Sequence, residues 1–413
     1  TGVTSDAQYN TVAGTSAGDS FTGTDATYNT LVGYEAGTAI TTGDYNVALG
    51  NHSLHDNTTG TRNVSIGGWN LEKNTTAEQN TAVGHYVMVN NTTGAYNTAV
   101  GAYALDASTT ADDNTAIGVH ALGVNTTGAS NTAIGRAALD ANTTGDNNVA
   151  VGKNALSAAT TADKNTALGY YAGADITTGV RNTAVGSEAI RQKTTSTDNT
   201  AVGFQALYQS SEGNHNTAIG SYALTANTTG TYNTSLGSQS LEANTTGDNN
   251  TAIGLKALEA NTTADANTAV GSFALVANTT GANNTAVGRD ALFANTTGQN
   301  QVAVGASALL ANTTGIRNTA IGQSALAANT IADWNVAVGA YALDANTTGT
   351  QNTAMNTALS ANTTGNYNTG IGYSALDLNT TGANNTAVGK SALAVNTTGG
   401  NLVAIGMNAL DAN

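Results

Sequence analysis

The chain has 413 residues, of which 9% are charged, against about 25% in a typical globular domain; it contains 48 glycines, no proline and no cysteine. The lack of cysteine excludes disulfides and thiolate metal sites. A formal net charge of −15 disfavours a nucleic-acid partner, because phosphates would be repelled. No apolar run approaches the roughly 18 residues that a membrane-spanning helix needs.

From Asn10 onward the chain is a tandem array of a 17-residue unit, Asn-Thr-Ala-Val-Gly-x-x-Ala-Leu-x-Ala-Asn-Thr-Thr-Gly-x-x. We number its positions 0 to 16 and count 24 copies, the last starting at Leu402. The first copy is two residues longer, and the copy from Asn352 is one shorter and lacks its glycine. Residues 1–413 therefore form one continuous array, and we expect it to be a segment of a longer protein because both ends fall partway through a copy.

Each copy is too short to bury a core alone, so neighbouring copies must stack. Positions 1–3 alternate as a strand does, whereas the glycine and the Asn-Thr-Thr-Gly stretch are typical of corners. Strands are thus expected at 11–13, then 30–32, and so on to 403–405. These features predict an all-β fold, a β-solenoid (β-roll) of 24 coils. A strand spacing of about 4.8 Å would make a rod roughly 115 Å long.

Comparison of the copies predicts an interior formed by positions 1, 3 and 8. Position 3 is almost always Val, Ile or Leu, and position 8 is usually Leu. Position 2 is Ala or Ser in nearly every copy, which indicates a tight contact on the other strand face as well. The expected core residues are Val100, Ile117 and Ile253 at position 3, and Leu105, Leu139, Leu224 and Leu343 at position 8.

Three copies carry glycine at position 8, and the same three carry a large apolar residue at position 11. The pairs are Gly18 with Phe21, Gly37 with Ile40, and Gly173 with Ile176. We therefore expect positions 8 and 11 to share one interior volume, because losing a buried Leu costs about 2–5 kcal/mol unless the hole is refilled. Leu224→Gly should destabilise the chain, and adding Asn227→Ile should partly restore it.

Glycine at position 4 is kept in all but the shortened copy, as at Gly101, Gly118 and Gly135, which suggests positive φ or close backbone approach. Position 14 accepts alanine in five copies, so it need not be left-handed. Asparagines at positions 0 and 11 are expected to form hydrogen-bonded ladders from coil to coil.

The sequence predicts no catalytic residue, no cofactor and no metal site, and hence no enzyme. His52 and His55 are three residues apart with only Asp56 nearby, which we interpret as a corner without a metal. The acidic residues lack the calcium-binding Gly-Gly-x-Gly-x-Asp pattern, so we interpret them as solvated surface charge.

Two features suggest surface roles. Tyr103, Tyr222, Tyr341 and Trp69, at position 6, could stack on glycans or pack at a subunit interface, although scattered surface aromatics are the simpler interpretation. The Asn-Thr-Thr triplets at Asn57, Asn142, Asn227 and Asn312 are formal N-glycosylation acceptors, against the simpler view that they are structural corners.

The element Asn-Thr-Ala-Val/Ile-Gly-x-x-Ala-Leu resembles the head repeats of trimeric autotransporter adhesins, Ser-Val-Ala-Ile-Gly-x-x-Ala. The whole chain is similar also to the Asn-Thr-Ala-x-Gly…Asn-Thr-Thr-Gly arrays of bacterial and phage tail-fibre-like proteins. This resemblance implies a left-handed β-roll, parallel trimers, and a role as stalk or receptor-binding surface.

These observations lead to one main hypothesis and two alternatives. The main one is an extracellular structural fibre or adhesin, on a cell surface or virion, that self-associates and contacts cell-surface glycans. The first alternative is a subunit of an end-to-end extracellular filament or matrix polymer. The second is an ice-binding protein, because flat threonine arrays order water.

Overall fold

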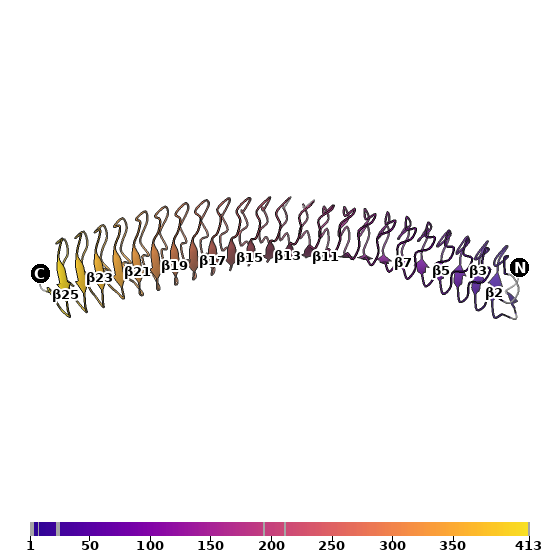
Figure 1. Cartoon of the computed structure of the whole chain (residues 1–413), viewed down its shortest axis with the longest axis horizontal. Coiled ribbons are helices and arrows are strands. Elements are labelled where there is room, and N and C mark those ends of the chain that lie inside the picture. The colour runs from indigo at the N-terminus through magenta and orange to yellow at the C-terminus, as the bar shows by residue number, and fades with distance from the viewer. Residues whose placement is uncertain (1–3, 7, 22–24, 193–194, 210–211, 412–413) are drawn as a thin grey trace. The chain divides into compact units, whose positions relative to one another are not determined.

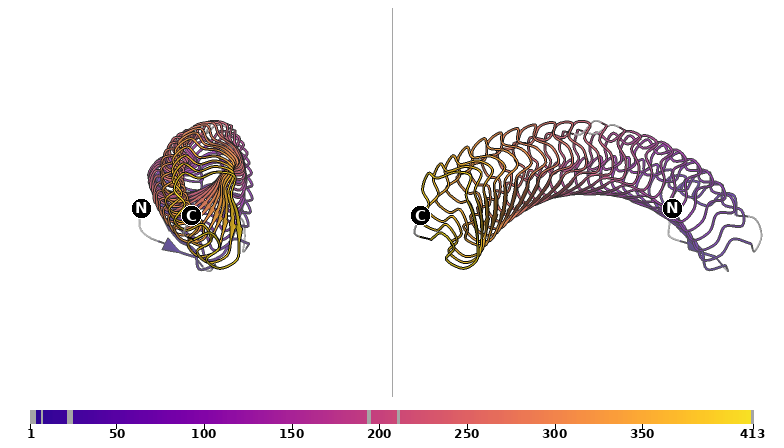
Figure 2. Two further views of the ribbon diagram at one scale, coloured as in Figure 1. Left: turned by 90° about the vertical axis from the view of Figure 1, so that its left-hand side faces the viewer. Right: turned by 60° about the vertical axis from the view of Figure 1, so that its left-hand side comes forward.

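The computed structural model describes residues 4–6, 8–21, 25–192, 195–209 and 212–411, and this part of the chain contains no helix. It divides into two compact units, Thr1–Glu212 and Gly213–Asn413. Within each unit every coil contributes one short strand, and the strands form a single row (Figure 1). The remainder of each coil loops away from that row and returns to it (Figure 2).

The strands of the first unit are β1 (Thr4–Ser5), β2 (Thr11–Ala13), β3 (Thr30–Val32), β4 (Val47–Leu49), β5 (Val64–Ile66), β6 (Thr81–Val83), β7 (Thr98–Val100), β8 (Thr115–Ile117), β9 (Thr132–Ile134), β10 (Val149–Val151), β11 (Thr166–Leu168), β12 (Thr183–Val185) and β13 (Thr200–Val202). The strands of the second unit are β14 (Thr217–Ile219), β15 (Thr234–Leu236), β16 (Thr251–Ile253), β17 (Thr268–Val270), β18 (Thr285–Val287), β19 (Val302–Val304), β20 (Thr319–Ile321), β21 (Val336–Val338), β22 (Thr353–Met355), β23 (Thr369–Ile371), β24 (Thr386–Val388) and β25 (Val403–Ile405).

Neighbouring strands within each unit are parallel and in register, one coil apart. Thr98 pairs with Thr115 and Val100 with Ile117, each 17 residues further on. β1 is the exception, because it runs antiparallel to β2. The predicted all-β solenoid with coils of about 17 residues is therefore confirmed.

The two irregular copies are absorbed without a break in register. Thr11 pairs with Thr30, so the longer first coil still closes, although residues 22–24 lie outside the described part of the chain. In the shortened coil Asn356 takes the place of the position-4 glycine. Its φ is +69°, and its backbone N–H donates to Val338 O at 2.7 Å. Asparagine is one of the few side chains that tolerate this left-handed backbone conformation.

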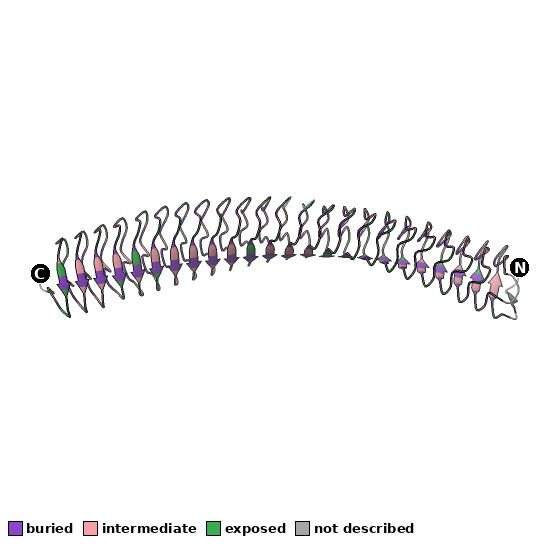
Figure 3. Ribbon diagram, in the orientation of Figure 1, coloured by how far each residue is buried: buried purple, intermediate pink, exposed green. Residues whose placement is uncertain are grey.

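The expectation that positions 1 and 3 point inward is wrong. Val100 is 36% exposed and Ile117 39% exposed, and Ile253 is also partly exposed, whereas Ala99 at position 2 is fully buried. In Figure 3 most strands combine a buried part with a more exposed part, and in β7 the buried residue is the central one. The physical reason is the narrow lumen of a 17-residue coil. The Cβ of a side chain at Gly370, a position-2 residue, would meet Ala358 Cβ at 3.1 Å and Leu359 Cδ1 at 3.3 Å, so only small residues fit opposite the leucines.

The leucines at position 8 do form the core. Leu105, Leu139, Leu224 and Leu343 are all fully buried. Each has a left-handed backbone, with φ between +50° and +54°. The residues at position 6 of the full-length coils are left-handed as well, as at Trp69 with φ of +62°. This conformation costs a non-glycine residue about 1–2 kcal/mol, which burial of the leucine side chain offsets.

The structure supports the exchange between positions 8 and 11. A Cβ on Gly37 would lie 2.8 Å from Ile40 Cδ1, and a Cβ on Gly173 would lie 3.2 Å from Ile176 Cδ1. For Gly18 the nearest atom is Phe21 Cε2, at 3.0 Å. Ile40 and Ile176 are buried, and Phe21 is partly buried. The side chain at position 11 thus fills part of the volume that leucine fills elsewhere, and it shares that volume with Leu31 beside Gly18 and Gly37 and with Leu156 beside Gly173.

Glycine at position 4 is required by both conformation and space. Gly101, Gly118 and Gly135 have φ values of +125°, +139° and +134°. A Cβ on Gly118 would lie 2.5 Å from the carbonyl oxygen of Gly135 in the next coil. No side chain can be placed there without separating the two coils.

Both expected asparagine ladders are present. At position 0, Asn97 N–H donates to Asn80 Oδ1 at 2.9 Å, and Asn97 Nδ2 donates to Ala111 O at 2.8 Å. At position 11, Asn278 Nδ2 donates to Asn261 Oδ1 at 3.0 Å and to Gly281 O at 2.9 Å. These buried amides satisfy backbone groups at the corners, where no strand ladder can do so.

Several acidic residues at position 15 are more than solvated charge. Asp112 Oδ1 accepts the backbone N–H of Ala95, one coil earlier, at 2.7 Å. Asp163 and Asp333 accept the equivalent N–H groups of Asp146 and Ile316, at 2.8 and 2.7 Å. A carboxylate therefore bridges two coils at this corner, so the prediction of purely solvated charge is wrong for these residues.

Candidate functional site

The strand row presents a regular outer face in each unit. Because position 2 points inward, positions 1 and 3 point outward, with Thr or Val in one column and Val, Ile or Leu in the other. Ile66, Val100, Ile117 and Ile134 are 36–39% exposed, and Leu168 is 50% exposed. The side chains in these two columns are uncharged, although the chain as a whole is acidic.

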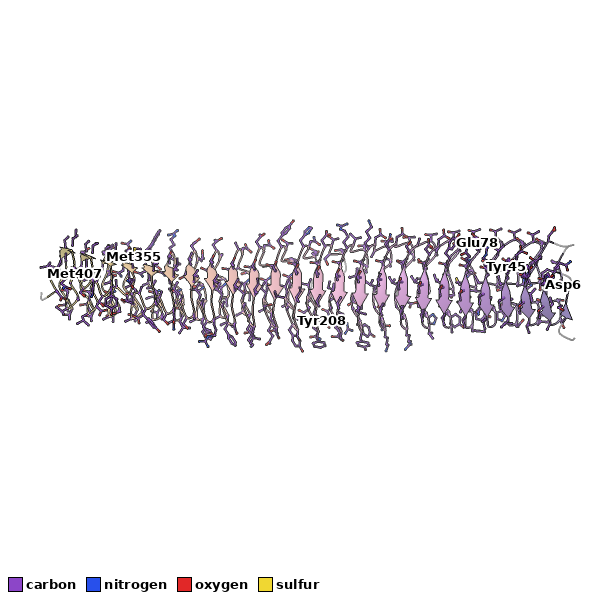
Figure 4. The ribbon with its side chains drawn as sticks, turned by 90° about the horizontal axis from the view of Figure 1, so that it is seen from below. Asp6, Tyr45, Glu78, Tyr208, Met355 and Met407 are labelled. Atoms are coloured by element: carbon purple, nitrogen blue, oxygen red, sulfur yellow. The ribbon has the colours of Figure 1, made fainter. Side chains whose placement is uncertain are left out.

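Charged and aromatic side chains lie at the margins of this face. Figure 4 places Glu78, at position 15, at one margin of the first unit and Tyr208, at position 9, at the opposite margin. The strand face itself is therefore an apolar and hydroxylated strip bounded by more polar edges.

The aromatic residues at position 6 form a ladder in the first unit. His52, Trp69, Tyr86, Tyr103 and His120 come from five successive coils, and their rings stack in nearly parallel planes. The four centroid distances are 4.2, 5.9, 5.7 and 5.1 Å. Tyr9, Tyr28 and Tyr45 form a second ladder, at 5.2 and 4.9 Å.

This stacking limits what the expected contact residues can bind. The faces of Trp69 and Tyr103 are covered by neighbouring rings, so only their edges reach solvent. Tyr222 is 36% exposed, and Tyr341 is 47% exposed between coils that carry Ser324 and Thr357 at this position. Among the predicted residues, Tyr341 thus presents the ring face best suited to a sugar.

The four predicted glycosylation acceptors are buried. Asn57, Asn142, Asn227 and Asn312 have no exposed surface, and each Nδ2 donates to the carbonyl oxygen three residues later. A glycan on any of these nitrogens would break the ladder and could not leave the interior. The structure therefore contradicts this expectation in the folded chain.

The two neighbouring histidines are part of a larger cluster. Glu35 Oε2 lies 3.3 Å from His52 Nε2 and 3.5 Å from His55 Nε2. The ligand atoms of these three residues all lie within 4.8 Å of one another. Glu35 was not among the predicted residues, although it stands 17 residues before His52 and so occupies the same position one coil earlier.

No protein-family model matches the chain, and no curated protein matches it. Among the described residues there is no helix long and apolar enough to cross a membrane.

Proposed function

We propose that this chain is a structural fibre module that projects from a cell or virion and associates with further copies of itself through the outer strand face. It acts as a scaffold rather than as an enzyme. The observation that carries this proposal is the pair of outward columns at positions 1 and 3 that follows the strand row of each unit. Soluble monomers rarely expose contiguous apolar strips of this kind.

A second copy is the occupant that this face fits best. Both partners would carry the same coil spacing, so side chains from one face can interdigitate with the other along the whole strip. The columns are also uncharged in a chain of net charge −15, so two faces can approach without direct repulsion.

The free energy gained by burying the position-3 side chains is of the same order as the free-energy cost of association. Burying the exposed remainder of each Val, Ile or Leu at position 3 contributes about 0.5–1 kcal/mol. The first unit has eleven such residues, from Val32 to Val202, which together contribute on the order of 5–11 kcal/mol. This is comparable with the roughly 4–15 kcal/mol that association costs, so threonine packing and partner number decide the final affinity.

Size-exclusion chromatography with light scattering, combined with electron microscopy, tests the proposal. We expect discrete oligomers, and we expect Val100→Lys with Ile117→Lys to yield monomers. Val119→Lys is the matched control, because Val119 is 43% exposed at position 5, outside the face. A monomeric parent chain, or equal dissociation by the control, would refute self-association through this face. Indefinite filaments would instead support the end-to-end polymer.

Ice binding is a second candidate, because the same face carries an outward threonine column in strand register, as at Thr81, Thr98, Thr115 and Thr132. An assay of ice recrystallisation distinguishes the two. Ice binding requires the face to remain open to water, so activity should come from monomers and should be lost in Thr98→Lys. Lack of activity in a monomeric preparation would exclude it.

Glycan contact is the finer part of the proposal. The exposed ring of Tyr341 supports it, since sugars stack on open aromatic faces. A glycan array probed with the parent chain and with Tyr341→Ala tests this contact, and equal binding by both would exclude that residue.

A further inference from the structure

The cluster of Glu35, His52 and His55 joins two adjacent coils. Glu35 and His52 both occupy position 6, in the coils that start at Asn29 and Asn46, and His55 follows three residues after His52. All three side chains are mostly shielded from solvent, with exposed fractions of 25%, 19% and 29%. Position 6 is held in a left-handed conformation, with φ of +54° at both Glu35 and His52, which orients the two side chains alike.

The spacing of the three groups suits a shared metal ion better than direct hydrogen bonds. A charge-assisted N–H···O bond is about 2.7–2.9 Å long. The distances from Glu35 Oε2 to the two imidazole nitrogens are 3.3 and 3.5 Å. Bonds of about 2.0–2.1 Å from a tetrahedral zinc ion would place its ligand atoms roughly 3.3–3.4 Å apart. The two measured separations match two edges of such a tetrahedron.

Groups around the cluster orient its members. His55 Nδ1 lies 2.6 Å from Asp56 Oδ1, a contact that places the proton on Nδ1 and leaves the Nε2 lone pair facing Glu35. A carboxylate behind a ligating histidine is a recurrent feature of zinc sites.

His52 is held by a different means. Its ring stacks on Trp69 with a centroid distance of 4.2 Å and an interplanar angle of 6°. Its Nδ1 is buried and has no hydrogen-bond partner, so ring stacking rather than a hydrogen bond orients the imidazole. The stack points Nε2 towards Glu35.

We propose that Glu35, His52 and His55 bind one divalent transition-metal ion, of which Zn²⁺ is the natural probe, and thereby clamp two neighbouring coils together. Two imidazoles and one carboxylate are a ligand set that zinc prefers, whereas calcium and magnesium favour oxygen ligands alone. Three protein ligands leave a fourth position for water or for a group from another molecule.

Calorimetric titration of the chelator-treated full chain with Zn²⁺ tests this proposal. We expect one ion per chain, and we expect His52→Ala, His55→Ala and Glu35→Gln each to weaken binding by more than about 100-fold. Asp56→Asn should weaken it by about 10–100-fold, as loss of a supporting carboxylate does. Cobalt(II) bound in place of zinc should show the intense visible absorption of a tetrahedral centre.

Two controls make the outcome decisive. His120→Ala removes a histidine of the same ladder that lies outside the cluster, and it should leave zinc binding unchanged. Circular dichroism without metal should show that the Glu35→Gln variant, which keeps the side-chain shape, is folded. The proposal is overturned if the parent chain binds no stoichiometric zinc, or if binding survives in the folded His52→Ala, His55→Ala and Glu35→Gln variants.

Discussion

The position-11 asparagine ladder is interrupted at Ser108, and restoring it should stabilise the chain. Ser108 Oγ is buried without a hydrogen-bond partner, and so is Asn91 Oδ1 in the preceding coil. In the following coil Asn125 Nδ2 donates to Gly128 O at 2.8 Å. The equivalent asparagines, such as Asn278, donate in addition to the asparagine one coil earlier, and Ser108 offers no such acceptor. One small residue thus leaves a gap in the ladder.

Ser108→Asn should close this gap. The new amide would donate to Asn91 Oδ1 and accept from Asn125 Nδ2. The coil of Ser108 carries alanine, Ala111, at position 14. An asparagine fits such a coil, because Asn74 lies in a coil with Ala77 at position 14 and its Nδ2 donates to Ala77 O at 3.2 Å. A buried polar group without a partner costs about 1–3 kcal/mol, so we expect the free energy of unfolding to rise by about 1–3 kcal/mol.

Urea denaturation followed by circular dichroism measures this gain, and hydrogen exchange locates it. Protection should rise in the coils around Ser108 and remain unchanged in coils far from it. Ser108→Ala is the matched control, because it removes the unpaired hydroxyl without completing the ladder. The reasoning is refuted if Ser108→Asn is no more stable than the parent chain, or if Ser108→Ala gains as much.

The remaining predictions use the same unfolding assay. Leu224→Gly should lower the free energy of unfolding by about 2–5 kcal/mol, reduced by about 1 kcal/mol because glycine relieves the left-handed strain. Adding Asn227→Ile should restore only part of the loss, because it interrupts the asparagine ladder. Equal stability of the single and double variants would contradict a shared volume. Gly118→Ala should destabilise the chain more than Gly128→Ala, because Gly118 has a φ of +139° that alanine adopts only with strain, whereas Gly128 stands at a position where five copies carry alanine. A Cβ would lie close to a carbonyl oxygen of the next coil at both sites, 2.5 and 2.4 Å away, so the backbone conformation makes the difference. Similar losses would contradict a special role for position 4. Burial raises the pKa of Asp106, with a neighbouring carboxylate adding to the effect, so folding disfavours its charged form. Its contribution to stability is then largest at low pH and is lost as the pH rises through the raised value, so Asp106→Asn should stabilise the chain more at pH 7 than at pH 3; an equal gain at both would contradict this assignment.

The periodic sequence by itself determined the length of the coil, the positions of the strands and the requirement for glycine at position 4. It did so because stacking places residue i against residue i+17, so each internal copy reports on the same local environment. The exchange between Gly37 and Ile40 was visible for the same reason. Two residues that share one buried volume must change together, whichever way the chain turns between them.

Only the tertiary structure decided which strand face is the interior. Strand alternation defines two faces, but it does not say which one a coil encloses. The usual preference for burying Val100 and Ile117 pointed to the wrong face. The lumen of a 17-residue coil has room for alanine opposite leucine and for little more, so the larger residues lie outside and form the exposed strip.

The histidine cluster shows the same division. The 17-residue period was sufficient to bring Glu35 beside His52, and this signal was present in the sequence. The position of His55 depended on the corner, where left-handed residues at positions 6 and 8 bend the backbone and return position 9 towards position 6. Leucine and tyrosine give no local sign of that conformation, because stacking between coils imposes it and burial of the leucine offsets its cost.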